Sequence, residues 1–219
     1  MIVTIDGPAG AGKSSAARAL AARLSFDFLD TGAMYRAVTL AAIRAGIDLH
    51  DRPALAHLLG TLHLEMPPGQ VRLNGEDVTG LIRTAQITAA TEPIADNPDI
   101  RRHLVSLQRH IAAKRNMVCE GRDQGTLVFP LAECKFFLVA DPLERARRRQ
   151  RDMAARGEKV ALDEVLRAQD IRDKRDAERD LAPMVPAADA VIVDSTHLTL
   201  ADLVDHLEEV VRRRQREDS

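Results

Sequence analysis

A complete phosphate-binding loop follows the first strand-like segment of the chain. Residues 7–14 read Gly-Pro-Ala-Gly-Ala-Gly-Lys-Ser, a full match to the pattern G-x-x-x-x-G-K-[ST], and they follow the apolar run 1–6. Glycine allows the backbone to turn successive N–H groups inward around a phosphate, at the start of the amphipathic segment 16–24. This context predicts a strand–loop–helix unit that binds nucleotide phosphates. The alternative is a glycine-rich turn without a ligand.

The residues of this loop have different expected roles. Lys13 is expected to reach the β- and γ-phosphates of ATP, and Ser14 is the expected ligand of Mg²⁺. The predicted ATP-binding set consists of Gly7, Pro8, Ala9, Gly10, Ala11, Gly12, Lys13, Ser14 and Ser15.

Composition and charge narrow the class of protein. The 219 residues suffice for one large α/β domain with an insertion. Hydrophobic residues make up 45% and aromatic residues 3%, so we expect an aliphatic, alanine-rich core. The net charge of −2 argues against a general nucleic-acid binder.

The cysteines and the apolar segments bear on compartment and assembly. Cys119 and Cys134 lie in apolar strand-like segments, which predicts buried free thiols of a reducing compartment rather than a metal pair. No apolar run approaches the length of a membrane span, and the sequence opens on a strand rather than a signal peptide. We therefore expect a cytoplasmic protein without a membrane partner, and a monomer because no strongly apolar exposed stripe is evident.

Strand and helix patterns alternate along the chain, which predicts an α/β fold with a mostly parallel five-stranded sheet flanked by helices. The strand-like segments are residues 2–5, 26–29, 117–119, 135–139 and 190–193. Asp99 is the expected cap of a helix whose apolar face contains Ile100, Leu104, Leu107 and Ile111. Thr199 and Asp202 resemble a capping box at the start of a last helix.

Residues 62–80 interrupt this alternation. They contain short β-like pieces at 62–66 and 71–73, and Asn74-Gly75 has the residues of a two-residue hairpin turn. The pattern predicts a small antiparallel β insert on the α/β body.

A basic segment interrupts it a second time. Between residues 145 and 159 two acidic residues, Asp152 and Glu158, accompany seven basic ones, which are Arg145, Arg147, Arg148, Arg149, Arg151, Arg156 and Lys159. Such a charge run is usually a solvated helix face. In a protein that holds a triphosphate, however, a mobile arginine segment can shield and neutralise the transferring phosphoryl group. We therefore favour an Arg-rich lid over residues 145–160, with Arg148 and Arg149 as its candidate catalytic residues.

Further segments, taken in their order and spacing, resemble the bacterial cytidylate kinases from Met1 to about Val211. They are Leu-Asp-Thr-Gly-Ala-Met-Tyr-Arg at 29–36, Gly-Glu-Asp-Val-Thr-Gly-Leu-Ile-Arg at 75–83, Glu-Gly-Arg-Asp-Gln-Gly-Thr-Leu-Val-Phe-Pro at 120–130, and Arg172-Asp-x-x-Asp176-x-x-Arg179 before Leu-Ala-Pro at 181–183. The resemblance implies ATP-dependent phosphorylation of CMP and dCMP to the diphosphates. It also implies a P-loop nucleoside monophosphate kinase fold, with a CORE over 1–219, a nucleotide-monophosphate-binding insert at 62–90 and a LID at 145–160.

The resemblance assigns roles to residues that match the family's motifs. Cytosine contacts fall on Thr31, Arg101 and Asp123, acceptor-phosphate contacts on Arg36 and Arg122, sugar contacts on Arg172 and Asp176, and a place near the transferring phosphoryl group on Arg179. The family's usual ribose-contacting Ser is replaced here by Glu92, which points either at the sugar or into solvent.

Simple chemistry supports part of these assignments. Cytosine offers an N4 amino donor where uracil has an acceptor, so the Asp123 carboxylate suits cytosine, although Asp123 is alternatively a helix or turn cap. Arg36 is alternatively a surface charge on a helix. CMP is largely dianionic at neutral pH and attacks without a general base. The seven histidines show no metal-ligand spacing and are interpreted as surface or packing residues.

Two other functions remain open on the sequence. A P-loop kinase for another nucleotide or a metabolite hydroxyl would have the same loop, although a hydroxyl acceptor normally needs a base. A nucleotide-dependent switch is the third reading, since residues 77–80 fit the pattern D-x-x-G, but the sequence contains no N-K-x-D guanine motif.

Overall fold

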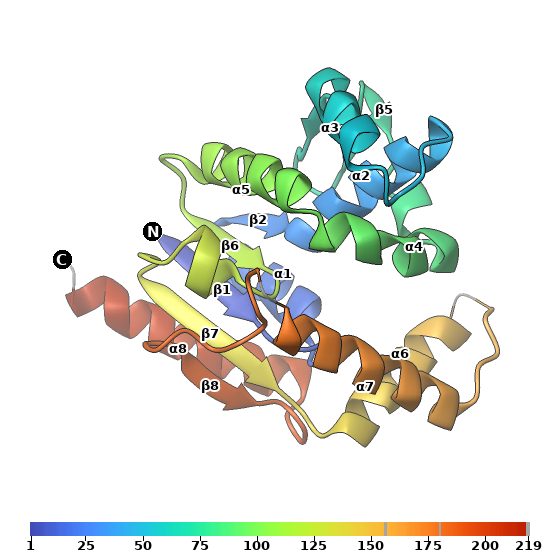
Figure 1. Ribbon diagram of the computed structural model, residues 1–219. Helices are drawn as coiled ribbons and strands as arrows, with labels where there is room; N and C mark the ends of the chain where they lie inside the picture. The colour runs from blue at the N-terminus through green and yellow to red at the C-terminus, as the bar shows by residue number, and fades with distance from the viewer. Residues whose placement is uncertain (156, 180, 218–219) are drawn as a thin grey trace. The chain divides into compact units, whose positions relative to one another are not determined.

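A computed structural model describes residues 1–155, 157–179 and 181–217 of the chain. The chain folds as two compact units (Figure 1), the first formed by Met1–Phe28 and Arg115–Ser219 and the second by Leu29–Lys114. The first unit contains the phosphate-binding loop and most of a parallel sheet. The second contains a small antiparallel sheet and four helices.

The large sheet has five strands in the order β2-β6-β1-β7-β8. Their bounds are Ile2–Asp6 for β1, Asp27–Asp30 for β2, Met117–Glu120 for β6, Cys134–Val139 for β7 and Val191–Asp194 for β8. Strand β1 pairs in parallel with β6 and β7, and β7 pairs in parallel with β8. The predicted five-stranded, mostly parallel sheet is therefore confirmed, with each strand placed within about one residue of its expected segment.

Strand β1 is the central strand of the large sheet, and this position explains why most of its residues are buried. Ile5 lies beside Glu120 of β6 and Phe136 of β7, and residues 3–6 are all buried. A parallel strand covered on both faces is buried along its length, and here the polar Thr4 and Asp6 are buried together with Val3 and Ile5. The carboxyl ends of β1 and β6 meet at one edge of the sheet, where open α/β folds bind their ligands.

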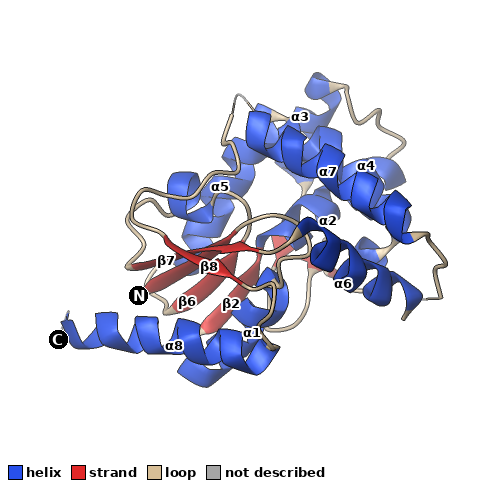
Figure 2. Cartoon of the chain, turned by 90° about the horizontal axis from the view of Figure 1, so that it is seen from below, coloured by secondary structure: helices blue, strands red, loops and turns tan. Residues whose placement is uncertain are grey.

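The first unit also contains four helices and a short π-helical turn. They are α1 (Lys13–Leu24), α6 (Pro142–Ala154), α7 (Leu162–Glu178), α8 (Leu200–Glu217) and the turn η2 (Gln124–Val128). Helices α1 and α8 pack on each other and on one face of the sheet (Figure 2). Their buried residues join those of β1 and β7 in a core of Ala, Val, Ile and Leu, with Phe136 as its aromatic member. This confirms the expected aliphatic core.

The second unit combines helices with the predicted insert. Its elements are α2 (Thr31–Arg44), α3 (Arg52–Thr61), β3 (Leu64–Glu65), β4 (Arg72–Leu73), β5 (Glu76–Asp77), the single 3₁₀ turn η1 (Leu81–Arg83), α4 (Ala85–Asp96) and α5 (Pro98–Ala112). The three short strands form an antiparallel sheet in the order β3-β4-β5. The insert boundaries 62–90 stay a prediction.

The Asn74-Gly75 turn is confirmed and joins β4 to β5. Both residues have positive φ, 51° and 85°, as a type I′ turn requires, and Asn and Gly are the residues that adopt this geometry most easily. The strands on either side are shorter than the sequence pieces suggested. Strand β5 was missed because Glu76–Asp77 is exposed and has no apolar residue.

Helix capping was predicted correctly at one helix and wrongly at another. Thr199 and Asp202 exchange hydrogen bonds as a capping box, with Thr199 Oγ1 accepting from Asp202 N. At α5 the expected cap, Asp99, is wrong, because Asn97 Oδ1 accepts from the backbone N–H groups of Asp99 and Ile100. Pro98 is the first residue of the helix, where a missing N–H costs nothing, and this moves the cap to the preceding residue.

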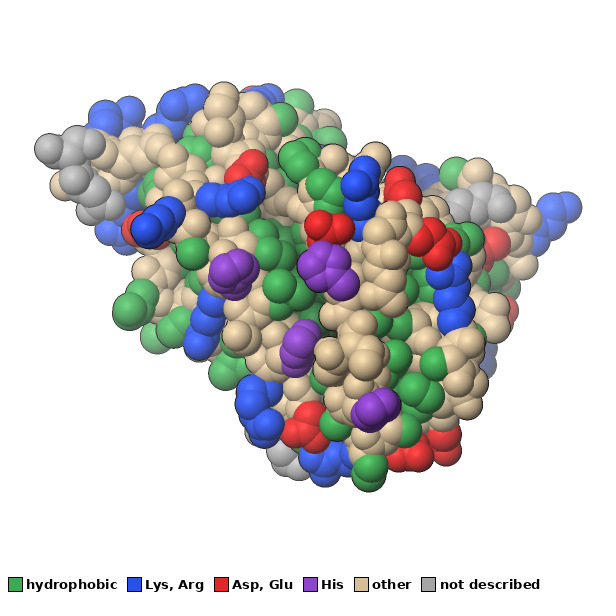
Figure 3. All heavy atoms as spheres, turned by 90° about the horizontal axis from the view of Figure 1, so that it is seen from above, with side chains coloured by type: hydrophobic (Ala, Val, Ile, Leu, Met, Phe, Trp, Pro, Cys, Tyr) green, Lys and Arg blue, Asp and Glu red, His purple; other side chains and the backbone are tan. Residues whose placement is uncertain are grey.

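Several remaining expectations are also settled by the structure. Cys119 and Cys134 are buried free thiols, as predicted. All seven histidines are exposed, and those visible in Figure 3 lie apart from one another on the surface. Among the residues that the structure describes, no helix is long and apolar enough to cross a membrane.

The corrected cap gives a stability prediction. Asn97→Ala leaves two backbone N–H groups of α5 without their acceptor and should lower the free energy of unfolding by about 1 kcal/mol. Asn97→Ser should keep most of the wild-type stability, because Ser also caps. Urea denaturation of the three proteins measures the difference.

Asp99→Ala is the matched control. Asp99 forms exposed ion pairs with Arg52 and Arg102, and such pairs contribute little. A loss for Asp99→Ala as large as that for Asn97→Ala would contradict the assignment of the cap.

Candidate active site

The phosphate-binding loop connects the end of β1 to the start of α1. Gly7 has φ 133°, and a Cβ at this position would lie 2.1 Å from the backbone oxygen of Leu138, so only glycine fits. Gly12 stands at the N-cap position of α1 and has no side chain to cover the first N–H groups of the helix. These groups stay available to an anion that binds at the start of α1.

Lys13 is a buried cation among other cations. Its Nζ donates to the backbone oxygen of Pro8 at 2.7 Å. Burial, together with the positive charges of Arg122 and Arg172, lowers the pKa of Lys13 to about 7, although Glu120 and Asp6 act in the opposite direction. A bound polyphosphate would add negative charge here and raise that pKa again. The loop is therefore arranged for an anionic ligand.

Ser14 and Glu120 place two side-chain oxygens next to each other beside Lys13. Ser14 Oγ donates to Glu120 Oε1 at 2.9 Å, and Glu120 is a buried carboxylate at the end of β6. Hydroxyl and carboxylate oxygens are hard donors that suit Mg²⁺. The predicted metal ligand, Ser14, thus has an acidic neighbour that the sequence analysis missed. A glutamate directly after the buried strand Met-Val-Cys was the available signal.

Asp6 holds the loop that follows β6. Its two carboxylate oxygens accept hydrogen bonds from Gln124 N at 2.9 Å and Gly125 N at 2.7 Å. Burial raises the pKa of Asp6 to about 6, although these two bonds act against the rise. The contacts fix the backbone next to Asp123, which is buried at the start of η2. The sequence analysis missed Asp6, which belongs to β1 and falls just outside the loop motif.

Arginines from two segments converge on Asp176 of α7. Asp176 is 1% exposed. It accepts from Arg122 Nε at 3.2 Å, Arg179 Nη2 at 2.7 Å and Arg175 Nη2 at 3.1 Å. Arg172 Nε lies 3.8 Å from the same carboxylate. Burial opposes ionisation, but the charges of Arg122, Arg179 and Arg172 lower the pKa of Asp176.

This cluster brings together four residues predicted from motifs, namely Arg122, Arg172, Asp176 and Arg179. Arg175 is a fifth member that the sequence analysis did not assign.

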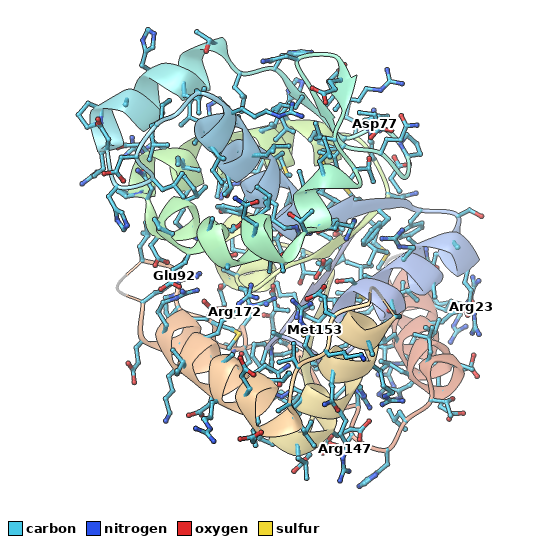
Figure 4. All side chains as sticks on the ribbon, turned by 90° about the vertical axis from the view of Figure 1, so that its right-hand side faces the viewer. Arg23, Asp77, Glu92, Arg147, Met153 and Arg172 are labelled. Atoms are coloured by element: carbon cyan, nitrogen blue, oxygen red, sulfur yellow. The ribbon has the colours of Figure 1, made fainter. Side chains whose placement is uncertain are left out.

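A pocket of about 740 Å³ opens beside the phosphate-binding loop. Predicted site residues line it from three elements, and Figure 4 labels two lining side chains, Arg172 of α7 and Met153 of α6. The predicted residues among the lining are Ala9, Gly10, Gly12, Lys13, Ser14, Ser15, Arg148, Arg149 and Arg172. The pocket therefore lies between the loop, the basic helix α6 and Arg172 of the Asp176 cluster.

The basic segment is not uniformly solvated. Arg145 is buried, Arg148 and Arg149 are half-buried, and Arg147 and Arg151 are exposed. Arg156 lies outside the described residues. The helix α6 contains the first part of the predicted lid, and closure of 145–160 over a ligand stays a prediction.

Arg148 forms hydrogen bonds with the loop after β8. Its Nη2 donates to the backbone oxygens of Ser195 at 2.6 Å and Thr196 at 3.1 Å. Ser195 Oγ in turn donates to the backbone oxygen of Ala11 in the phosphate-binding loop at 2.9 Å. Arg148 thus supports the phosphate-binding loop from outside, and both Arg148 and Arg149 line the pocket.

The second unit has its own buried charge cluster at the start of α2. Asp30 caps this helix by accepting from Ala33 N at 2.8 Å, and it also pairs with Arg36 at 3.4 Å and with Arg83 at 3.0 Å. Burial opposes ionisation of Asp30, but the charges of Arg36 and Arg83 lower its pKa. Arg36 is therefore more than a surface charge, and Arg83 was missed although the motif at 75–83 ends on it.

The other predicted residues of this unit are placed as follows. Thr31 is buried as the first residue of α2. Arg101 is buried on α5, where its Nη1 donates to the backbone oxygen of Ala95 at 3.1 Å and its guanidinium lies 5.9 Å from the centre of the Tyr35 ring. Glu92 is exposed on α4. Their assigned contacts with CMP stay predictions.

A parallel sheet whose first strand runs into a complete phosphate-binding loop, with buried cations around that loop, defines a P-loop protein. The sequence profile described as cytidylate kinase matches residues 3–213. Curated cytidylate kinases of Carboxydothermus hydrogenoformans and Geobacter sulfurreducens are 45% and 46% identical, over 98% and 99% of this chain and 98% and 94% of theirs. The chain belongs to the cytidylate kinase family.

Solved structures with low sequence identity share the fold. A shikimate kinase from Bacteroides thetaiotaomicron superposes with a TM-score of 0.52 at 16% identity, over 97% of this chain and 98% of that one. A gluconokinase from Sinorhizobium meliloti 1021 gives a TM-score of 0.50 at 17% identity, over 98% and 93%. At these identities the likeness supports the P-loop kinase fold alone.

The environment of Lys13 gives a pH prediction. With a pKa of about 7 in the free protein, Lys13 loses its proton as the pH rises above 7, whereas a complex with MgADP would need the charged form. Binding at pH 8 should therefore take up close to one proton, and affinity should fall with rising pH. Calorimetry in buffers of different ionisation enthalpy measures the uptake.

Lys13→Arg is the matched control, because arginine stays charged at this pH. It should bind MgADP without proton uptake. Equal proton uptake by Lys13→Arg and the wild type would show that another group titrates.

Proposed function

We propose that the protein transfers the γ-phosphoryl group of MgATP to CMP or dCMP by in-line attack, yielding ADP and CDP or dCDP. The observation that supports this most strongly is the buried cation site of the first unit, where Lys13 of the complete loop shares one pocket with Arg172 of the Asp176 cluster. Membership of the cytidylate kinase family indicates the acceptor.

The donor nucleotide would bind along residues 7–15. The backbone N–H groups of the loop and Lys13 suit the β- and γ-phosphates. Ser14 and Glu120 would hold Mg²⁺, which when bound neutralises and orients the phosphate oxygens. Arg148 donates to Ser195 Oγ, which donates to the backbone oxygen of Ala11, so these contacts would support the loop in its binding conformation.

The acceptor needs positioning rather than a base. The CMP phosphate is mostly dianionic at neutral pH, so no proton has to be removed before it attacks. Two polyanions must approach each other, and Arg36, Arg122 and Arg179 would offset their repulsion. Arg172 and Asp176 would hold the sugar. Cytosine would meet Thr31, Arg101 and the carboxylate of Asp123.

The arginines of the predicted lid would act late in the reaction. Water must be excluded from the γ-phosphate, because otherwise ATP is hydrolysed. Arg149 lines the pocket, and its cation would stabilise charge on the transferring group as residues 145–160 close. We propose a cytoplasmic monomer that uses ATP and CMP or dCMP as its small-molecule partners.

Base selectivity tests the proposed acceptor. A coupled assay of ADP release over CMP, dCMP, UMP, AMP and GMP should show CMP and dCMP far ahead. Asp123→Ala should reduce the CMP to UMP ratio of kcat/KM by about a hundredfold or more, mainly by harming CMP, since a site built for a hydrogen bond leaves polar groups unpaired without it. Equal losses for CMP and UMP would mark Asp123 as structural, and no acceptor dependence at all would refute the proposed function.

Substitutions of the two candidate lid arginines, Arg148 and Arg149, should have different effects. Arg149→Ala should lower kcat by about a hundredfold, because the cation is needed only as charge develops on the transferring phosphoryl group. Arg148→Ala should lower kcat and also the melting temperature, because the carbonyl oxygens of Ser195 and Thr196 lose their charged donor. Kinetics and thermal unfolding of both variants provide the test, and wild-type kcat for Arg149→Ala would remove Arg149 from the mechanism.

A further inference from the structure

Helix α7 has a polar buried face where a packing helix normally has an apolar one. Gln169, Asp173 and Asp176 stand four and three residues apart, so their side chains share one face of the helix. Gln169 and Asp176 are buried, and Asp173 is largely shielded. Only Val165 adds an apolar side chain among the buried residues of the described part of this helix. Such a face stabilises packing poorly, which points to a role other than cohesion.

The partner of this face is Arg145 in the first part of α6. Arg145 is 7% exposed. Its Nε donates to the backbone oxygen of Ala140 at 3.1 Å, and its Nη1 donates to the backbone oxygen of Ala9 at 3.0 Å. The same Nη1 forms an ion pair with Asp173. One guanidinium therefore joins the end of the β7 segment, the phosphate-binding loop and helix α7.

A second contact joins the same elements at the tip of the loop. Gln169 Nε2 donates to the backbone oxygen of Arg145 at 3.4 Å. Gly10 has φ 79°, and a Cβ there would lie 2.9 Å from Gln169 Nε2 and 3.0 Å from the backbone oxygen of Arg145. The tip of the loop is thus packed against both helices without spare room. A shift of α7 must displace Ala9 and Gly10 as well.

The energetics of the buried Arg145–Asp173 ion pair indicate that it orients helix α7 rather than adding stability. Removing two charges from water costs about as much as their attraction returns, so a buried ion pair adds little stability compared with apolar side chains of similar volume. What the pair does supply is direction, because the planar guanidinium accepts only a narrow range of partner positions. Arg145 therefore fixes the register of α7 against the loop.

We propose that Arg145 is a positioning residue that couples the donor site to the acceptor site through Asp173. Asp173 directly follows Arg172 and lies one turn before Asp176, the residues that would hold the acceptor sugar. The proposal thus rests on the proposed function. It deepens that function, because binding at the phosphate-binding loop and binding at α7 should depend on each other through this one side chain.

The experiment measures equilibrium binding of MgADP and of CMP separately to the full chain, by calorimetry. Asp173→Asn changes a residue of α7 and none of the phosphate-binding loop. It should nevertheless weaken the binding of both CMP and MgADP, the latter by about fivefold or more. Arg145→Lys cannot reach all three partners and should weaken CMP binding to a similar extent, although Lys keeps the charge. Coupling between sites typically has this size or larger.

A double variant separates positioning from stability. Arg145→Met with Asp173→Leu replaces the buried pair by apolar side chains and should melt close to the wild-type temperature, while both nucleotides still bind at least about fivefold more weakly. If the double variant does not fold, the binding data for Asp173→Asn and Arg145→Lys decide alone. Arg167→Lys is the control, because Arg167 pairs with Asp163 on the exposed side of α7 and should leave both affinities unchanged.

The outcomes distinguish this inference from the proposed function. If each single variant weakens only the nucleotide on its own side, or the folded double variant binds both nucleotides like the wild type, Arg145 is a scaffold residue and the inference is overturned. If the wild type binds neither MgADP nor CMP, the proposed function fails instead.

Discussion

The site depends on positive charges that lie close together around one loop. Burial, together with the positive charges of Arg122 and Arg172, lowers the pKa of Lys13 to about 7. Buried carboxylates keep this cluster in place, since Glu120 and Asp6 act on Lys13 and Asp176 binds the arginines. The fold provides both sets at the carboxyl ends of β1 and β6 and on α7. A phosphate-bearing ligand would supply the remaining negative charge, so its binding would also reduce the repulsion between these cations.

The basic segment shows how one charge run can be divided among roles. Arg145 is buried and joins the phosphate-binding loop to α7, Arg148 holds the Ser195 segment that supports Ala11, and Arg149 faces the pocket. Arg147 is exposed to solvent. Neither of the two sequence interpretations, a solvated helix face or a mobile lid, describes all these arginines. Neighbouring residues on a helix face different directions, so roles change from one position to the next.

Local signals in the sequence were sufficient for the sheet, the phosphate-binding loop and the hairpin turn. The buried strands are short apolar runs, the loop is a complete motif, and Asn74-Gly75 has the backbone freedom that its turn needs. The cap of α5 was also within reach, because Pro98 marks the first helical residue. The roles of Asp6 and Glu120 were harder to predict, since their hydrogen-bond partners lie more than a hundred residues away in the sequence, at Gln124 and Gly125 for Asp6 and at Ser14 for Glu120. Arg175 stands next to its partner Asp176 in the sequence, and its place among the other arginines appears only in the folded cluster. The interaction of Arg148 with Ser195 likewise appears only after folding.

The central claim is that this one set of charges holds a donor and an acceptor nucleotide at once. An analogue in which five phosphates join adenosine to cytidine spans both sites and tests it directly. Calorimetry with Mg²⁺ should show this analogue binding at least about a hundredfold more tightly than ATP, as expected for a ligand that resembles the transition state, and Arg122→Met should remove most of that advantage. An affinity equal to that of ATP, or an advantage that survives Arg122→Met, would contradict the account.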